Sequence, residues 1–259
     1  MTYEMDMTDR VVLVTGGGRG VGAGIAEVFL RAGASVEICG RREPESAIEV
    51  DERRTHFSAV DIREADQVAD WIADIESRRG RLDIVVNNAG GAPFAEFGDG
   101  SPRFHAKIND LNFMGVVHVA HAAYPLLRRS GSGVMLSVTS ISARRPSPGT
   151  AVYGAAKAAV ESLTTSLAVE WAPGVRVNAV SCGLVATPGS TGHYGSDEQA
   201  ARVAATIPRG VLATPQDVGQ ACLLLASPLA EHVTGAVLDV DGGGERPAFL
   251  QHTPNAGRS

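Results

Sequence analysis

Val11-Val12-Leu13-Val14-Thr15-Gly16-Gly17-Gly18-Arg19-Gly20-Val21-Gly22 is the stretch that decides how this chain folds. Its first four residues are an unbroken aliphatic run, which predicts a buried strand. The glycines that follow predict a tight turn, and residues 23–32 have helical periodicity. Strand, glycine turn and helix in this order predict the first unit of an α/β fold with a parallel sheet.

The glycine turn also predicts a ligand. Glycines let the backbone pass close to a pyrophosphate, whose charge the free N–H groups and the positive end of the following helix then stabilise. A turn that only packs the helix on the strand is the alternative. The order of strand, turn and helix favours a dinucleotide, and the residues expected to contact it are Gly16, Gly18, Arg19, Gly20, Val21 and Gly22.

The second predicted strand, residues 35–39, favours one dinucleotide over the other. NAD enzymes typically place an acidic residue at its end, where the carboxylate accepts hydrogen bonds from the adenosine ribose. Here Gly40 occupies that position, and Arg41 follows. Arg41 and Arg19 could bind a 2′-phosphate, so the sequence favours NADP(H). NAD(H) is the alternative, because acidic residues follow closely and such arginines are often only solvated.

Composition limits the remaining classes of function. The 259 residues, 44% of them hydrophobic, suffice for one large domain over 1–259. A net charge of -6 and the absence of a long basic tract argue against nucleic-acid binding. Short apolar runs and a polar N-terminus predict a soluble, cytoplasmic protein without membrane contact. The odd, widely spaced cysteines predict buried thiols and neither disulfides nor a metal site.

The pair Tyr153 and Lys157 indicates a tyrosine that transfers a proton. They lie four residues apart on a predicted helix, residues 151–171, which places both side chains on one face. A nearby ammonium favours the phenolate, so we expect the tyrosine pKa to lie below its usual value of about 10. Ser140, at the end of the predicted strand 134–138, could hold a carbonyl or alkoxide oxygen beside the phenol.

These motifs together resemble the short-chain dehydrogenase/reductase family. Ser140 stands thirteen residues before Tyr153, Lys157 follows it by four, and Asn87-Asn88-Ala89-Gly90 matches the family's own tetrapeptide. The resemblance covers about residues 8–244. It implies a single-domain, Rossmann-type, doubly wound fold with a seven-stranded parallel sheet, helices on both faces and a cleft at the carboxyl ends of the strands.

The resemblance also implies roles for individual residues. Asn112 joins Ser140, Tyr153 and Lys157 as a catalytic residue that completes a proton path. Asp61 would contact the adenine, although it could instead cap the predicted helix 64–78. The cofactor contacts implied beyond the glycine turn are Gly40, Arg41, Asp61, Ile62, Asn88, Ala89, Gly90, Tyr153, Lys157, Gly183, Val185 and Thr187.

Two departures from the family pattern leave alternatives open. Cys182 replaces the usual proline, so a thiol lies near the predicted cofactor, where it is either reactive or a buried inert group. Arg144 and Arg145 stand where the family often has small or apolar residues. They could meet an anionic substrate, contact a neighbouring subunit, or form a solvated surface pair.

The expected reaction is hydride transfer between NADP(H) and a carbonyl or secondary alcohol, for example a 3-oxoacyl or alicyclic ketone. A non-catalytic, nucleotide-sensing protein with the same fold is the alternative from another class. The family places a substrate lid at residues 188–210. The side chains expected to line the substrate pocket are Phe94, Ser142, Leu184, His193 and Tyr194.

The predicted helices 101–128 and 151–171 suggest self-association. Small and apolar residues cover more than one face of each, whereas one stripe is enough for packing on a sheet. We therefore expect a dimer or tetramer formed through these helices. The polar tail, residues 245–259, is expected to be extended and ordered only by contacts elsewhere.

Overall fold

The computed structural model describes residues 5–187 and 194–249. In that part of the chain seven parallel strands form one sheet in the order β5-β2-β1-β6-β7-β8-β9. This confirms the predicted sheet. The strands are β1 Val11–Thr15, β2 Ser35–Gly40, β5 His56–Ala59, β6 Ile84–Asn87, β7 Gly133–Ser140, β8 Val175–Cys182 and β9 Val237–Val240.

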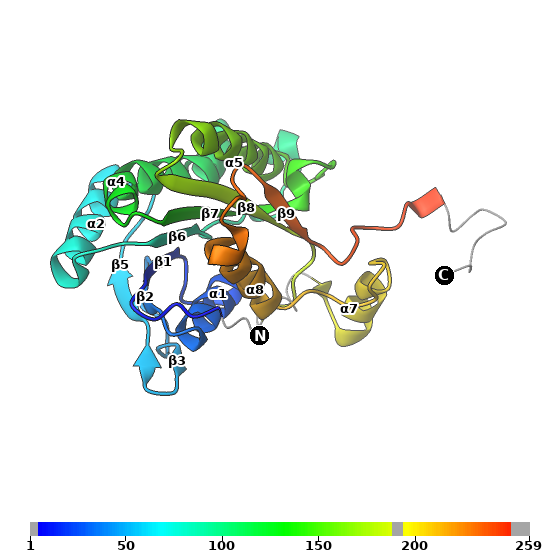
Figure 1. Ribbon diagram of the computed structural model, residues 1–259. Helices are drawn as coiled ribbons and strands as arrows, with labels where there is room; N and C mark the ends of the chain where they lie inside the picture. Colours follow the sequence, from blue (N-terminus) through cyan, green and yellow to red (C-terminus); the bar gives the residue numbers. More distant parts are fainter. Residues whose placement is uncertain (1–4, 188–193, 250–259) are drawn as a thin grey trace.

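Helices cover both faces of the sheet, as the doubly wound fold requires (Figure 1). On one face lie α1 (Gly20–Arg31) and α8 (Pro215–Ala226). On the other lie α2 (Ala65–Arg79), α4 (Gly115–Arg129) and α5 (Ala151–Glu170). Among the residues described, no helix is both long and apolar enough to cross a membrane.

Each face of the sheet contributes to its own hydrophobic core, because alternate side chains of a strand point to opposite faces. In β1, Val12 and Val14 pack with α1 and α8, whereas Leu13 packs with α2 and α4. The two helices of the first face approach closely through glycine. A Cβ atom on Gly24 of α1 would lie 2.3 Å from the Cβ of Pro215 in α8, so only glycine permits this contact.

The direction of winding changes between β1 and β6, and this change positions the site. Strands added after β1 extend the sheet one way, to β2 and β5, and the strands from β6 onward extend it the other way. Loops therefore diverge at the carboxyl ends of β1 and β6, which is where doubly wound sheets bind ligands. Thr15 Oγ1 joins the two loops by accepting hydrogen bonds from the amides of Asn88 (3.0 Å) and Ala89 (2.9 Å).

The predicted continuous helix 101–128 is wrong. It is divided into α3 (Pro102–Asn109), a π-helical turn (Asp110–Met114) and α4. The Asn112 side-chain amide donates to the Ile108 carbonyl at 2.8 Å. That carbonyl is the acceptor that the backbone N–H of residue 112 would use in a regular α-helix, so the side chain competes with the helical pattern.

Two smaller features complete the fold. A short antiparallel hairpin, β3 (Glu49–Val50) and β4 (Arg53–Arg54), precedes β5 and was not predicted. Thr214 and Asp217 form a reciprocal capping box at the start of α8. The described part of the segment predicted as a lid contains a short helix, α7 (Asp197–Ala204).

Candidate functional site

Three predicted catalytic side chains lie together where β7 ends and α5 begins. Ser140 is the last residue of β7, and it shares a side-chain hydrogen bond with Tyr153 in the first turn of α5. Lys157 Nζ lies 5.7 Å from the centre of the Tyr153 ring and donates to the carbonyl of Val138 at 2.8 Å. The fold thus gathers the hydroxyl, the phenol and the ammonium at one place.

Asn112 lies beside this cluster, in the π-helical turn. Its Oδ1 accepts from the amide of Gly91 at 2.8 Å, and its Nδ2 donates to the Gly91 carbonyl at 2.9 Å. A Cβ atom on Gly90 would lie 2.6 Å from Asn112 Oδ1 and 3.2 Å from Lys157 Nζ. Two predicted catalytic residues therefore converge on the loop that follows β6.

The predicted lowering of the tyrosine pKa is wrong for this structure. Burial raises the pKa of Tyr153 above its usual value of 10.0, and the hydrogen bond with Ser140 opposes the shift only in part. Burial also lowers the pKa of Lys157 to about 8. Desolvation disfavours both charged forms, and it outweighs the attraction that the i,i+4 spacing predicted.

The glycine turn forms a cradle at the start of α1. Arg19 precedes the helix without capping it through its side chain, so the N-cap position supplies no side-chain acceptor for the first-turn N–H groups. Gly16 adopts φ +63°, where its missing Cβ lets the Ala89 Cα approach. Thr187, another predicted cofactor residue, faces the turn, since a Cβ on Gly20 would lie 3.7 Å from its Cγ2.

Cys182 is a buried strand residue. It ends β8, lies opposite Ser140 in the register of the two strands, and is 7% exposed. Burial raises the pKa of its thiol to about 12. A thiol with that pKa is almost wholly protonated at neutral pH and is a weak nucleophile, which favours the inert alternative over the reactive one. Cys182 is paired in register with Ser140 of β7 and with Val240 of β9.

Comparison with known proteins identifies the family. The sequence model of a family described as enoyl-(acyl carrier protein) reductase matches residues 16–245. The chain is 34% identical over 253 residues to the 3alpha-hydroxysteroid dehydrogenase of Mediterraneibacter gnavus, covering 92% of this chain and 98% of that enzyme.

Two solved structures are similar as well. The ligand-free aldohexose dehydrogenase of Thermoplasma acidophilum has a TM-score of 0.85 and 30% identity, over 92% of this chain and 94% of that one. A protein titled short chain dehydrogenase/reductase family protein has a TM-score of 0.82 and 36% identity, over 92% and 98%. The chain belongs to the short-chain dehydrogenase/reductase family. It is thus an oxidoreductase that acts on alcohol or carbonyl groups.

Enzymes of the short-chain dehydrogenase/reductase family use NAD or NADP, and the residues at the switch between β1 and β6 fit such a dinucleotide. A Cβ on Gly22 would lie 2.3 Å from the Gly16 carbonyl oxygen, so only glycine permits this closely folded turn. The turn leaves the start of α1 open to an anion. The shape of the turn therefore fits an anionic group, and the pyrophosphate contacts of its individual residues stay a prediction.

Asp61 and Ile62, which the resemblance places against the adenine, both have other contacts in the structure. Asp61 does not cap α2; its carboxylate accepts from the backbone and the guanidinium of Arg63, which lowers the pKa of Asp61. The sequence analysis did not consider Arg63. An arginine two residues after Asp61 was a signal that the carboxylate would be paired. Ile62 packs in the core, where a Cβ on Gly115 would lie 2.6 Å from its Cδ1.

The predicted substrate residues that the structure describes lie in several loops beyond the carboxyl ends of the strands. Ser142 donates its backbone N–H to Ser140 Oγ at 3.2 Å. Phe94 is 77% exposed, and its ring lies against Gly149 in the loop before α5. Tyr194 is half-buried, and a backbone hydrogen bond with Val185 partly opposes the rise in its pKa that burial causes. Leu184 is half-buried beyond β8, and His193 lies outside the described residues.

Arg144 and Arg145 are exposed surface residues, as one of the alternatives predicted, and both also form ion pairs. Arg144 bonds to Glu161 of α5 and to Asp239 of β9, each at 2.9 Å. Arg145 pairs with Glu245 in the segment after β9. Sequence reasoning missed these acidic partners because they lie 17 to 100 positions away along the chain. The described tail beyond residue 244 is exposed and extends away from the sheet (Figure 1).

Proposed function

We propose that this short-chain dehydrogenase/reductase transfers a hydride between NADP(H) and a carbonyl or secondary alcohol, with Asn112, Ser140, Tyr153 and Lys157 as its catalytic residues. The meeting of these four side chains beside the glycine cradle carries the proposal. A hydroxysteroid dehydrogenase and an aldohexose dehydrogenase are among its similar proteins, which supports a ring-bearing secondary alcohol or ketone as substrate.

The bound cofactor supplies or accepts the hydride. Ser140 holds the substrate oxygen, and Tyr153 donates its phenolic proton to that oxygen during reduction. Because burial keeps the pKa of Tyr153 above 10, the phenol carries its proton at neutral pH, as a donor must. In oxidation the phenol must first lose that proton. We therefore expect the rate of the oxidation reaction to rise as the pH increases above neutrality.

The surrounding loops fix this geometry. Asn112 holds Gly91 through two hydrogen bonds, and Lys157 is anchored to β7 through Val138. Gly183, Val185 and Thr187 would line the nicotinamide end of the cofactor. The segment 188–210, whose described part includes α7, would act as the lid over the substrate.

A turnover screen tests the proposal. The purified protein is assayed with NADPH and with NADH against alicyclic ketones, 3-oxoacyl thioesters and aldoses, and the reverse reaction is assayed with the alcohols. Cofactor binding is measured separately by fluorescence. We expect turnover of a ring ketone with NADPH. Tight cofactor binding without turnover of any member of the panel would instead support a nucleotide-sensing protein.

Arg41 should set the preference for NADP(H). In the described part of the chain, Arg41 and Arg19 are exposed and have no carboxylate within ion-pair distance, whereas Asp61 is already paired with Arg63. A charge-assisted hydrogen bond contributes about 1.5–3 kcal/mol. Arg41→Ala should therefore raise the Kd for NADPH by roughly 10- to 100-fold and leave the Kd for NADH almost unchanged.

Arg54→Ala is the matched control for charge. Arg54 is an exposed arginine of β4, just before β5 begins, and so lies near the amino ends of the parallel strands, whereas Arg41 follows the carboxyl end of β2. Its removal should not alter the ratio of the two affinities. Equal losses for NADPH and NADH in Arg41→Ala, or tighter binding of NADH by the wild-type protein, would show that the alternative cofactor is the right one.

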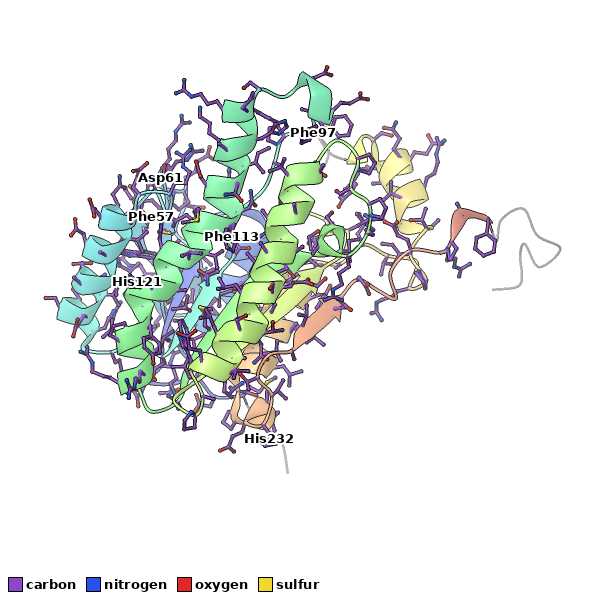
Figure 2. The ribbon with its side chains drawn as sticks, turned by 90° about the horizontal axis from the view of Figure 1, so that it is seen from above. Phe57, Asp61, Phe97, Phe113, His121 and His232 are labelled. Atoms are coloured by element: carbon purple, nitrogen blue, oxygen red, sulfur yellow. The ribbon has the colours of Figure 1, made fainter. Side chains whose placement is uncertain are left out.

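We further propose that the outer faces of α4 and α5 join two copies of the chain. Figure 2 shows these helices side by side on the near face of the molecule, with no element in front of them. Val169 of α5 is 82% exposed, and small and apolar residues cover more than one face of this helix. Val169→Glu should therefore halve the mass measured by light scattering, whereas Ala69→Glu, at an exposed site on α2, should not. A monomeric wild-type protein would contradict this proposal.

A further inference from the structure

We propose that Glu161 is a positioning residue that, with Arg144 and Asp239, fixes the hydroxyl of Ser140 relative to Tyr153. The inference rests on the proposed function, because it assigns a role in the same reaction. None of these three residues belongs to the predicted site. Glu161 lies four residues after Lys157 on α5, and Asp239 lies in β9.

One carboxylate holds the chain on both sides of Ser140. Thr139, the residue before Ser140, donates its hydroxyl to Glu161 Oε1 at 3.0 Å. Arg144, which follows the short 3-10 turn η3 (Ile141–Ala143), donates from Nε to Glu161 Oε2 at 2.9 Å. The end of β7 and the turn after it are thus attached to the helix that carries Tyr153 and Lys157.

A second anchor holds the same turn from another direction. Arg144 Nη1 bonds to both carboxylate oxygens of Asp239, at 2.9 and 3.0 Å. The guanidinium is a planar fork with several donors, so one side chain can bridge α5 and β9 in a fixed orientation. The backbone N–H groups of Arg144 and Arg145 both donate to the Ile141 carbonyl, which closes the turn.

The turn η3, held by these two anchors, fixes the orientation of the Ser140 hydroxyl. The amide of Ser142, inside η3, donates to Ser140 Oγ at 3.2 Å. With that lone pair occupied, the Ser140 hydroxyl keeps a defined orientation toward Tyr153, with which it shares a hydrogen bond. If the turn moved away from α5, the bond from the Ser142 amide to Ser140 Oγ would lengthen and the hydroxyl would lose this restraint.

The contacts of Arg144 should matter more for positioning Ser140 than for the global stability of the protein. The Arg144 and Asp239 side chains are 43% and 44% exposed, so their pair should contribute little to global stability, whereas Glu161 is only 14% exposed. A displacement of about 1 Å in a reacting group can nevertheless lower the rate by about 10²-fold. Loss of these contacts should therefore affect turnover far more than the melting temperature.

Kinetics of Glu161→Ala and Arg144→Ala test the inference. We expect kcat to fall about 10- to 100-fold, with the Kd for NADPH unchanged and Tm within a few degrees of wild type. Glu161→Gln keeps the shape and one acceptor oxygen for Arg144, and its side-chain NH2 can donate to Thr139 Oγ1 instead of accepting from it, so it should recover part of the activity. Arg145→Ala is the matched control, because Arg145 pairs with Glu245 and touches neither Thr139 nor Glu161; it should retain wild-type kcat.

A titration gives a readout that needs no turnover. The bond with Ser140 lowers the pKa of Tyr153, so its loss should raise that pKa, followed by NMR of ring-labelled tyrosine. Wild-type kcat together with an unchanged Tyr153 pKa in both alanine variants would overturn the positioning role. If the wild-type protein reduces no carbonyl, the proposed function fails, and the titration still decides whether Glu161 orients Ser140.

Discussion

Replacing Tyr153 with phenylalanine should lower kcat by about 10³-fold while the Kd for NADPH stays within about twofold of wild type. The substitution removes one hydroxyl and leaves the ring, so the packing of α5 against the loop before it is kept. What is lost is the proton donor, and with it the hydrogen bond to Ser140. General acid catalysis by a placed side chain contributes about 10²- to 10⁴-fold, which sets the size of the expected loss.

The measurement is steady-state reduction of the best ketone from the panel, with cofactor affinity from fluorescence titration of the same samples. Tyr124→Phe is the matched control, since Tyr124 packs against Trp171 near the far end of α4. It should keep wild-type kcat. More than about a tenth of wild-type turnover in Tyr153→Phe would show that another group donates the proton.

Replacing Lys157 with methionine should abolish most turnover and also change how stability depends on pH. Lys157 is 3% exposed, and burial lowers the pKa of its ammonium to about 8 from the usual 10.5. Below pH 8 both the folded and the unfolded chain carry the proton, and the folded state bears the full cost of the buried charge. That cost is roughly 3 kcal/mol for a shift of this size.

Between pH 8 and 10.5 the unfolded chain keeps the proton that the folded chain has released. The unfolded state then binds more protons, so the contribution of Lys157 to stability rises with pH in this window. Lys157→Met lacks this contribution. Relative to the variant, the wild-type protein should therefore gain stability from pH 8 to 10, although the variant leaves the Val138 carbonyl without its side-chain donor at every pH.

Urea unfolding of both proteins at several pH values measures this difference. The control is Lys107→Met, because Lys107 is the chain's other lysine and is exposed on α3. It should follow the wild-type curve. A constant difference between wild type and Lys157→Met across the window would mean that the ammonium remains protonated in the folded protein.

Local patterns in the sequence were sufficient for the architecture. The aliphatic run before the glycine turn predicted β1, and the alternation of such runs with helical segments predicted the seven-stranded parallel sheet. The spacing of Ser140, Tyr153 and Lys157 predicted which side chains would meet. Periodicity and short-range spacing act within one or two turns of chain, where backbone geometry alone fixes the neighbours.

Only the tertiary structure shows whether the pKa values at the site rise or fall. The i,i+4 spacing indicated an acidic tyrosine, whereas burial makes the Tyr153 phenol less acidic than usual. Burial is produced by every element packed around the site, so a segment of sequence does not report it. The division of the predicted helix 101–128 also depended on a side-chain competition at Asn112 that helical periodicity does not record.

The sequence by itself therefore determined the fold, the nucleotide turn and the identity of the side chains at the candidate site. Only the tertiary structure decided their protonation and the partners that hold them, such as Asp239 for Arg144, 95 residues apart. The physical reason is distance along the chain. Backbone conformation follows from neighbouring residues, whereas desolvation and ion pairing follow from whichever distant residues the fold brings into contact.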